Sequence, residues 1–468
     1  MEHQEVLAVI RNFLAPRQLS YIEELVICHS WEGKRYHEMS LETGYEEGYL
    51  KSTGCILWQL LSKKLGCQVT KKRFPYILAE MTRTKSPEAV TVGPSQATNH
   101  ASAYPDVVSL ASLEGSLRSE LKPLLEYPGS PLSYGSPLYI QRSPIEALAA
   151  SAIQHPGGLL RIKAPWRMGK TSLMNYLLGQ CRQQGYTTAM IDVRQADTRA
   201  LGNLDAFFRW FCWTLNQQLN LPCDLDHYWF DDAGSKLNCT THMQEHVLAQ
   251  LNSPLVIAID SSHYLMEHPV IAQNFFSMLR SWYELAKRRP QWQKLRLMLA
   301  YVADLDLPLQ TYQSPFNVGM PVELPYFQWP QIHKLQECYG MDTVSQDEAS
   351  ALESLVNFVG GHPYLIQLAF YWLQSKQISV AQILHTAATS QGIYREYLRR
   401  IWSAIHQKQA LIMAFYQVLA SPDPVYLNPK QACALADMGL VELMGHQVKL
   451  RCELYRAYFG PLMELECG

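Results

Sequence analysis

Short apolar runs alternate with longer amphipathic stretches between residues 137 and 324. The apolar runs cover 159–163, 188–193, 255–260, 295–302 and 321–324. Runs of about four to eight apolar residues separated by helical stretches are typical of parallel strands covered by helices on both faces. The pattern therefore predicts an α/β fold with a five-stranded parallel sheet.

A helical pattern follows the last of these runs. Residues 329–339, 348–358 and 364–376 predict a small helical lid. The segment 378–468 is helical at first and then contains two strand-like stretches, 439–443 and 447–451, on either side of a Gly-His turn. Helices followed by two short strands around a glycine turn predict a winged helix.

The first 82 residues form a helical block punctuated by aromatic residues. Residues 36–45 contain a short helix and a glycine turn, and a longer helix follows over 46–65, which together predict a helix-turn-helix domain. The segment 83–133 is rich in Pro, Ser, Gly, Thr and Ala, a composition that buries little apolar surface. We therefore predict a flexible linker between this all-α domain and the α/β domain.

The most informative motif lies between the first apolar run and the helix after it. Residues 164–172 read APWRMGKTS, and Met168 to Ser172 contain the Gly-Lys-Thr end of a phosphate-binding loop. In such loops backbone N–H groups hold the phosphates, the lysine reaches the outer phosphates and the hydroxyl after it binds Mg²⁺. The motif thus predicts a binding site for ATP or ADP with Mg²⁺, formed by Gly169, Lys170 and Thr171. The first position is Ala164 instead of glycine, so a Gly-Lys-Thr helix start without a ligand is the alternative.

A second sequence element supports nucleotide binding but lacks a residue that hydrolysis normally needs. The apolar strand 255–260 ends in Asp260, which we predict to support Mg²⁺ together with Thr171. A glutamate that orients water normally follows, and Ser261 stands there instead. The next strand ends in Val302 and Ala303, where a polar group would face the γ-phosphate. We predict nucleotide binding with weak or absent hydrolysis, with His263 as an alternative base.

Composition and charge narrow the possible partners. The 468 residues contain 40 Lys plus Arg against 42 Asp plus Glu, so any contact with DNA must use a local patch. No apolar run approaches the roughly 18 residues of a membrane span. The N-terminus is acidic where a signal peptide would be basic. We expect a cytoplasmic protein that does not contact a membrane, with its 11 cysteines reduced.

Three smaller groups of residues are candidates for function. His242 and His246 lie four residues apart with Glu245 between them, which fits either a zinc site or a packed helix. His362 and Pro363 follow two glycines and form either a plain turn or the part of the lid that faces the nucleotide. A basic cluster in the helix-turn-helix domain could contact DNA, while the apolar residues of the same helix leave a protein partner equally open: Lys51, Lys63, Lys64, Lys71 and Lys72.

From Tyr134 onward the chain resembles the AAA-like ATPase domain of cyanobacterial multidomain proteins, within the STAND and AAA+ groups of P-loop switches. The motifs that carry the resemblance include MGKTSL at 168–173, GSKLNCT at 234–240, SPFNVG at 314–319 and GGHPYL at 360–365. The first 80 or so residues, with SWEG at 30–33 and LWQLLS at 57–62, resemble the helix-turn-helix domain of vWA-MoxR-associated systems.

The resemblance implies an ATP switch. Nucleotide would lie between the α/β core, the lid and the winged helix, with Arg142 near the base and His362 near the phosphates. The Asp-Glu-x-Asp of the family is replaced here by Asp260-Ser261-Ser262-His263, and its Ser-Thr sensor by Val302-Ala303. The resemblance therefore also favours a domain that binds ATP and hydrolyses it slowly or not at all.

Five domains follow from these patterns: a helix-turn-helix domain (1–82), a linker (83–133), a nucleotide-binding domain (134–326), a lid (327–377) and a winged helix (378–468). We expect a regulatory or signalling switch that couples nucleotide state to DNA or a protein partner, and that could form a homo-oligomer. The alternatives are an active oligomeric ATPase acting on DNA, with Arg280, Arg288 or Arg289 completing a neighbour's site, and a scaffold that binds no nucleotide.

Overall fold

The chain divides into two compact units, Met1–Glu114 and Gly115–Gly468, which are described separately. The computed structural model describes residues 126–302, 314–341, 346–375 and 378–467, and, within the first 78, residues 6, 7, 10, 11, 19, 21–43, 45, 50, 51, 53, 54, 57, 58, 60–62, 69, 71, 74 and 78. The division between the units falls inside the predicted linker, and the five domain bounds stay predictions.

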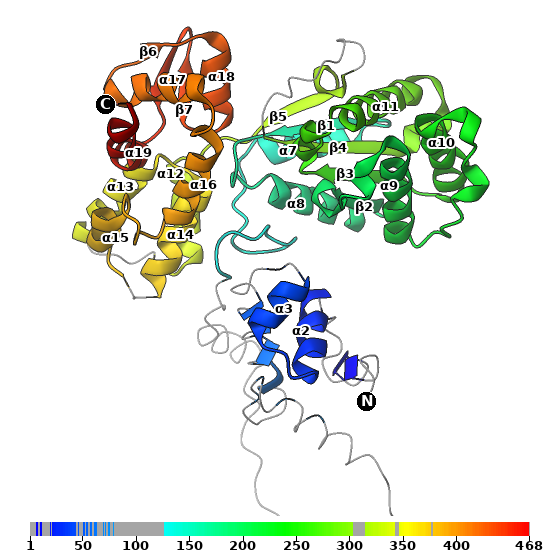
Figure 1. Cartoon of the computed structure of the whole chain (residues 1–468), viewed down its shortest axis with the longest axis horizontal. Helices are drawn as coiled ribbons and strands as arrows, with labels where there is room; N and C mark the ends of the chain where they lie inside the picture. Colours follow the sequence, from blue (N-terminus) through cyan, green and yellow to red (C-terminus); the bar gives the residue numbers. More distant parts are fainter. Residues whose placement is uncertain are drawn as a thin grey trace, which may run out of the picture. The chain divides into compact units, whose positions relative to one another are not determined.

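A five-stranded parallel sheet forms the centre of the second unit (Figure 1). Its strands are β1 (Leu159–Lys163), β2 (Thr187–Asp192), β3 (Leu255–Asp260), β4 (Leu295–Tyr301) and β5 (Met320–Glu323), in the order β2-β3-β4-β1-β5. Every residue of β3 and β4 is buried, because both strands have strand neighbours and helices above and below. The predicted sheet is confirmed.

Helices cover both faces of this sheet (Figure 1). One face packs against α9 (Leu204–Leu219), α10 (Ser235–His242) and α11 (Pro269–Arg288), and the other against α7 (Ile145–Gln154) and α8 (Lys170–Gln183). Side chains alternate along β3, so that Ile257 and Ile259 join the first core and Val256 and Ala258 the second. The carboxyl ends of all five strands therefore meet at one edge, where ligands bind in open parallel sheets.

The remainder of the second unit is helical and ends in a small sheet. Its helices are α12 (Trp329–Cys338), α13 (Gln346–Val359), α14 (Pro363–Gln374), α15 (Val380–Thr386), α16 (Arg395–Ile405), α17 (Gln409–Ala420), α18 (Pro429–Asp437) and α19 (Glu453–Cys467). An antiparallel sheet in the order β6-β8-β7 joins β6 (Val425–Tyr426), β7 (Val441–Met444) and β8 (Gln447–Leu450). The winged helix is therefore present, with a first strand that the sequence pattern did not predict.

The lid and the winged helix share one hydrophobic core. Phe370 of α14, Phe415 of α17 and Tyr455 of α19 belong to the same buried cluster. The predicted boundary between these two domains at residue 377 thus runs through a continuous core. The lid and the winged helix together form one body, which lies beside the α/β core in Figure 1.

The first unit contains α2 (Tyr21–Trp31) and α3 (Tyr36–Thr43), and the described positions between 50 and 62 are helical. Tyr36 joins these elements, because its hydroxyl oxygen accepts a hydrogen bond from Trp58 Nε1 at 2.9 Å. A Cβ at Gly54 would lie 2.1 Å from the same oxygen, so only glycine permits this approach. This close approach of Gly54 to Tyr36 fits the predicted helix-turn-helix domain.

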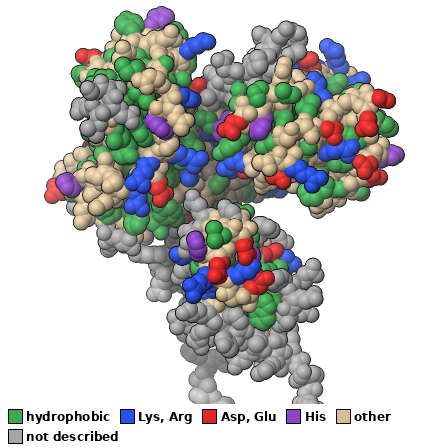
Figure 2. Space-filling model, in the orientation of Figure 1, with side chains coloured by type: hydrophobic (Ala, Val, Ile, Leu, Met, Phe, Trp, Pro, Cys, Tyr) green, Lys and Arg blue, Asp and Glu red, His purple; other side chains and the backbone are tan. Residues whose placement is uncertain are grey.

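No helix in the described ranges has the length and apolar character of a membrane span. On the face shown in Figure 2, acidic and basic side chains are interspersed among the described residues. A single-sign field of the kind that attracts nucleic acid over a wide area is not seen on that face.

Candidate functional site

The loop between β1 and α8 has the backbone geometry of an anion-binding turn. Gly169 caps the N-terminus of α8 with φ +90°, in the left-handed region that favours glycine. A Cβ there would also lie 3.1 Å from Arg142 Nη2. The first N–H groups of a helix have no partner within the helix, and the helix dipole favours negative charge near them. The predicted loop is therefore built to receive an anion at the start of α8.

Lys170 is the first residue of α8, and its side chain turns back over the loop. Its Nζ donates to the carbonyl oxygens of Ala164 at 2.9 Å and Pro165 at 2.8 Å. Burial lowers the pKa of Lys170 to about 8, and the charge of Asp260 opposes this shift. No ion pair joins Lys170 to a carboxylate in the described part of the chain. An anion bound beside it would offset the cost of burying this charge.

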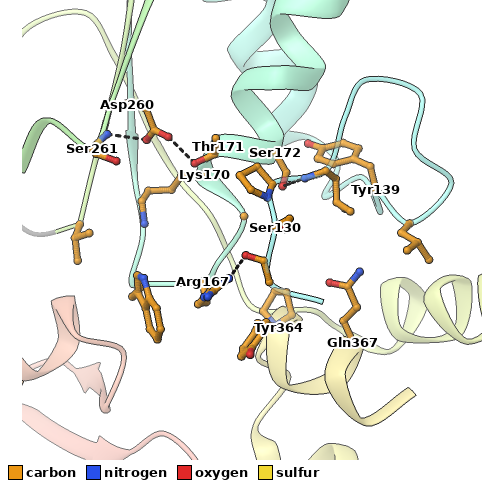
Figure 3. A pocket seen from close by; sticks show the side chains of 18 of the residues that line it. Ser130, Tyr139, Arg167, Lys170, Thr171, Ser172, Asp260, Ser261, Tyr364 and Gln367 are labelled. Carbon is orange, nitrogen blue, oxygen red and sulfur yellow. Dashed lines mark hydrogen bonds between the residues drawn. The ribbon is translucent and has the colours of Figure 1, made fainter. Parts of the chain in front are cut away.

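Thr171 and Asp260 meet at the carboxyl edge of the sheet (Figure 3). Thr171 Oγ1 donates to Asp260 Oδ2 at 2.7 Å, and the backbone N–H of Ser261 donates to Asp260 Oδ1 at 2.7 Å. Asp260 is buried. Mg²⁺ prefers oxygen ligands, and it is usually held by one or two protein groups together with phosphates. The described residues contain no cluster of three or more His, Cys, Asp or Glu side chains that could hold a metal ion.

The positions expected to support hydrolysis carry no carboxylate. Ser261 lines the cavity with φ +57°, and Ser262 is buried, donating from Oγ to the carbonyl of Ala300 at 2.9 Å. Burial lowers the pKa of His263 to about 4, with nearby Lys170 acting in the same direction. This imidazole is therefore neutral near pH 7 but a weak base. Val302 also lines the cavity, and Ala303 lies outside the described residues.

A cavity of about 290 Å³ extends from this loop to α14. Its cationic lining residues, within the described ranges, are Arg142, Arg167, Lys170, Arg194 and Arg400, whereas Asp260 is the single acid. The predicted site residues that line it are Arg142, Gly169, Lys170, Thr171, Ser172, Asp260 and Pro363. The excess of positive charge suits a polyanionic ligand.

Two predicted site residues lie outside the cavity lining. Met168 is buried in the core and contributes only its carbonyl oxygen, which accepts from Arg142. The His362 ring is 1% exposed and packs edge-to-face on Tyr326 and Tyr397, at ring distances of 5.8 and 5.2 Å. Burial lowers the pKa of His362 to about 3. The ring is therefore neutral near pH 7, and its contact with the nucleotide stays a prediction.

Arg142 has buried donors without protein partners. Its Nη2 donates to the carbonyl of Met168 at 2.8 Å, and its guanidinium lies 5.0 Å from the ring centre of Phe327. Nε and Nη1 are buried with no hydrogen-bond partner among the described residues. Glu146 does not supply one, since its carboxylate accepts from the Arg142 backbone N–H at 2.8 and 2.9 Å. Buried donors are almost always satisfied, so this side chain calls for an acceptor from a ligand.

Two family models match the sequence. Residues 127–461 match the model described as the AAA-like domain, and residues 1–81 match the vWA-MoxR associated protein N-terminal HTH. The chain belongs to the AAA-like domain family. No curated protein matches it.

Solved structures of P-loop ATPases resemble the AAA-like domain. The Walker-type ATPase of Pyrococcus abyssi is 13% identical, with a TM-score of 0.50 over 71% of this chain and 98% of that one. The ORC2 protein of Aeropyrum pernix, in ADPNP-ADP complexes, is 13% identical with a TM-score of 0.44 over 74% and 98%. The ORC1 protein of the same organism, in complex with DNA, is 10% identical with a TM-score of 0.37 over 71% and 97%. At these identities the likeness shows the fold alone.

Some residues that line the cavity of the AAA-like domain were not predicted from the sequence. Residues 129–132 lay in the predicted linker, yet they line the cavity, and the Leu132 backbone N–H donates to Ser172 Oγ at 3.0 Å. This part of the predicted linker therefore packs against the start of α8. Their Pro, Gly and Ser composition gave no signal of packing. Tyr139 also lines the cavity and stacks on Tyr176 at 4.8 Å, while Gln367 faces the loop from α14 (Figure 3).

The zinc alternative for His242 and His246 receives no support from their contacts. His242 Nε2 bonds Asn216 Oδ1 at 3.0 Å, and His246 Nε2 bonds the carbonyl of Pro222 at 2.9 Å. The two rings stack on each other with centres 4.9 Å apart; His242 ends α10, and His246 lies in the π-helical turn Met243–Leu248. Each Nε2 is thus occupied by a protein partner, which favours the packed-helix interpretation.

Two of the three arginines predicted as candidates to complete a neighbour's site, Arg280 and Arg289, have partners inside the chain. Arg280 pairs with Glu284 at 2.7 Å, and Arg289 Nη1 donates to Gln244 Oε1 at 2.9 Å. In the first unit, Lys51 is exposed and Lys71 Nζ lies 4.4 Å from the ring centre of Tyr36. Burial lowers the pKa of Lys71. The predicted DNA contacts Lys63, Lys64 and Lys72 lie outside the described residues.

Proposed function

We propose that the AAA-like domain binds ATP with Mg²⁺ and works as a nucleotide-dependent switch that hydrolyses ATP weakly or not at all. The observation that carries this proposal is the group formed by Lys170, Thr171 and Asp260, at one end of a cavity with five cationic side chains and a single carboxylate. A nucleoside triphosphate carries the opposite charge and needs these partners.

The lining residues fit each part of the ligand. The start of α8 and Lys170 would hold the phosphates, and Thr171 and Asp260 would hold Mg²⁺, which neutralises phosphate charge when it is bound. Beside Met168 and Gly169 of the loop, the unpartnered Nε and Nη1 of Arg142 are donors for a ligand acceptor. Tyr139 and the Gln367 amide line the same cavity and suit a flat, polar base.

Weak hydrolysis follows from the residues after Asp260. A group that orients or activates the attacking water is worth about 10² to 10⁴ in rate. Ser261 has no carboxylate, and His263 is a weak base because burial lowers its pKa to about 4. ATP would then act as a ligand that favours one conformation, and a thousandfold excess over its Kd stabilises the bound state by about 4 kcal/mol.

The switch would act through the N-terminal helix-turn-helix, on DNA or on a protein partner. If the output is DNA, its affinity falls steeply with salt, and the slope decreases when Lys51 is neutralised. A protein partner would show a shallower salt dependence. The STAND type, the signalling role, the cyanobacterial source, the cytoplasmic location and the homo-oligomer stay predictions from the sequence.

The experiment is calorimetric unfolding of the full chain with ATP and Mg²⁺, ATP and EDTA, or neither. We expect ATP with Mg²⁺ to raise the Tm by several degrees and Lys170→Ala to abolish the shift. Lys430→Ala, which removes an exposed cation from α18, is the matched control and should keep it. An unchanged Tm for the wild type at millimolar ATP would reject nucleotide binding and favour the scaffold alternative.

A further inference from the structure

The segment 127–134 forms a strap along one wall of the cavity, from the lid to α8. At the first end of the strap, the Tyr127 ring packs edge-to-face on Tyr371 of α14, with ring centres 5.2 Å apart. Its middle residues, 129–132, line the cavity. Arg167 of the phosphate loop donates to the carbonyl of Gly129. The strap therefore contacts both the lid and the loop before it reaches α8.

The strap is bound to the start of α8 through the backbone of Leu132. The Leu132 N–H donates to Ser172 Oγ at 3.0 Å, and its carbonyl oxygen accepts from Asn175 Nδ2 at 3.0 Å. Both backbone groups of Leu132 are thus satisfied by side chains of α8. Ser172 directly follows Thr171, the proposed Mg²⁺ ligand. The helix proposed to bind the phosphates therefore also holds the strap.

Tyr134 fastens the far end of the strap on Gly179 of α8. A Cβ at Gly179 would lie 2.1 Å from ring carbons Cγ and Cδ2 and 2.8 Å from Cβ of Tyr134, so only glycine admits this ring. Tyr134 Oη also donates to Gln183 Oε1 at 2.8 Å, one helical turn further along. Glycine inside a helix is less favourable than alanine. The contact with Tyr134 is therefore the structural reason for a glycine at this position.

Two glycines flank the part of the strap that contacts α8. Gly129 and Gly135 adopt φ +129° and +81°, conformations that favour glycine. A Cβ at Gly135 would meet no atom within 4 Å, so its surroundings leave room for backbone movement. Residues of this kind at the ends of a segment can act as hinges. The contacts of Leu132 and Tyr134 with α8 thus decide whether the segment between the two glycines stays closed.

We propose that the strap closes the cavity over the bound nucleotide, and that the contact of Tyr134 with Gly179 sets how fast the nucleotide leaves. The inference rests on the proposed function and adds the control of nucleotide exchange at the same site. A nucleotide bound along the loop has residues 129–132 against it. The strap lifts before the nucleotide leaves, as a closing loop does in many sites where release is slow.

The rate of release matters because the proposed switch hydrolyses ATP weakly or not at all. Turnover does not end the ATP-bound state of such a switch, so the state lasts until the nucleotide dissociates. Most differences in affinity between related complexes arise in the dissociation rate. The contacts that hold the strap on α8 therefore set the lifetime of the bound state.

The test compares Gly179→Ala with Gly202→Ala in the full chain. A Cβ at Gly202 meets no atom within 4 Å, so this variant controls for the loss of a glycine. A labelled non-hydrolysable ATP analogue is bound with Mg²⁺ and chased with excess unlabelled analogue, and the label that stays on the protein is followed over time. Gly179→Ala should speed dissociation about tenfold or more, because the Tyr134 ring no longer fits. Gly202→Ala should dissociate at the wild-type rate.

Tyr134→Gly separates an effect on the strap from an effect on α8. This variant removes the three Tyr134 atoms nearest to a Cβ at Gly179, and it should itself speed dissociation about tenfold. Adding Gly179→Ala to Tyr134→Gly should change the rate less than about twofold, because both substitutions act through one contact. If Gly179→Ala acted by distorting α8, its effect would persist in the double variant.

The strap itself is followed by hydrogen exchange of the Leu132 amide, which donates to Ser172. This amide should exchange more slowly with the ATP analogue than without it in the wild type, and faster in Gly179→Ala than in the wild type. Unchanged exchange, dissociation of Gly179→Ala at the wild-type rate, or a persistent effect in the double variant would overturn this inference and leave nucleotide binding intact. If the wild type bound no analogue at equilibrium, the proposed function would fail and this inference with it.

Discussion

The two sides of the cavity differ in which of the residues expected for nucleotide binding and hydrolysis they contain. On the side of the loop and α8 stand Lys170 and Thr171, the residues proposed to bind phosphate and Mg²⁺, and Asp260 of β3 accepts a hydrogen bond from Thr171. On the side that follows β3 and β4, Ser261 and Val302 occupy the positions where a water-orienting carboxylate and a polar sensor would stand.

In the proposed function, binding and hydrolysis depend on separate groups of one site. Affinity comes from cations, backbone N–H groups and a metal, which act on the phosphates in their ground state. Rate comes from a group that acts only on the attacking water. Loss of the second group leaves the first intact, so the same fold can act as a binding switch.

The largest expected effect restores the missing group. Ser261→Glu should raise the ATP turnover rate about 100-fold or more, because a carboxylate would again stand next to Asp260. Ser261→Gln has nearly the same size and no charge, and it should leave turnover at the wild-type level. Phosphate release under saturating ATP measures both. Equal rates for the two variants would show that the defect lies elsewhere.

The next effect concerns Arg142. Arg142→Met should weaken ATP and ADP alike, about 10- to 100-fold, because it removes the unpartnered Nε and Nη1 donors. The free energy of unfolding without nucleotide should stay level or rise, because a buried charge is removed.

Arg296→Met is the matched control for that substitution. Arg296 is also buried, but its donors bond the carbonyls of Ile153, Gln293 and Lys294. We expect this variant to lower the free energy of unfolding and to leave the nucleotide Kd unchanged. Urea unfolding and calorimetric titration measure both quantities. If Arg142→Met instead lowered the free energy of unfolding and left the nucleotide Kd unchanged, Arg142 would stabilise the fold and would not bind the nucleotide.

A smaller effect appears with pH. The pKa of Lys170 is lowered to about 8, and bound phosphates favour its charged form, so affinity is full below pH 8. Above pH 8 the free protein loses this proton, and the affinity should fall by up to about tenfold per pH unit. Lys170→Arg stays charged and should give a flat profile between pH 7.5 and pH 9.5. A flat wild-type profile would contradict the role of Lys170.

The smallest effect separates the metal from the phosphates. Asp260→Asn should weaken ATP with Mg²⁺ several-fold, because one oxygen charge near the metal is lost. It should strengthen ATP in EDTA by a similar factor, because a carboxylate no longer repels the phosphates. Thr171→Ser keeps the hydroxyl and serves as the control. A change of the same sign in both conditions would argue against a metal site at Asp260.

The sequence predicted those parts whose signal is local. The bounds of β1 and β3 agree with the apolar runs, because buried parallel strands are continuously apolar. The Gly-Lys-Thr motif and Asp260 could be placed because they directly follow such strands. β6 has only two residues, Val425 and Tyr426, and is too short to produce a pattern.

Other parts of the site depend on contacts between distant segments. The part of the predicted linker at 129–132 contacts α8 through single backbone bonds that no composition reveals. Arg400 reaches the loop only because the C-terminal body packs beside it, and His362 packs on the rings of Tyr326 and Tyr397, outside the cavity lining. Such placements follow from tertiary packing, which lies beyond local periodicity.

One measurement tests the central claim most directly. The full chain is mixed with a limiting amount of radiolabelled ATP and Mg²⁺, and the protein-bound nucleotide is separated and identified over time. We predict that the bound nucleotide remains ATP, with a single-turnover rate of about 10⁻³ s⁻¹ or less, as in P-loop proteins that lack a complete site. Conversion to ADP at about 1 s⁻¹ or faster would contradict the account.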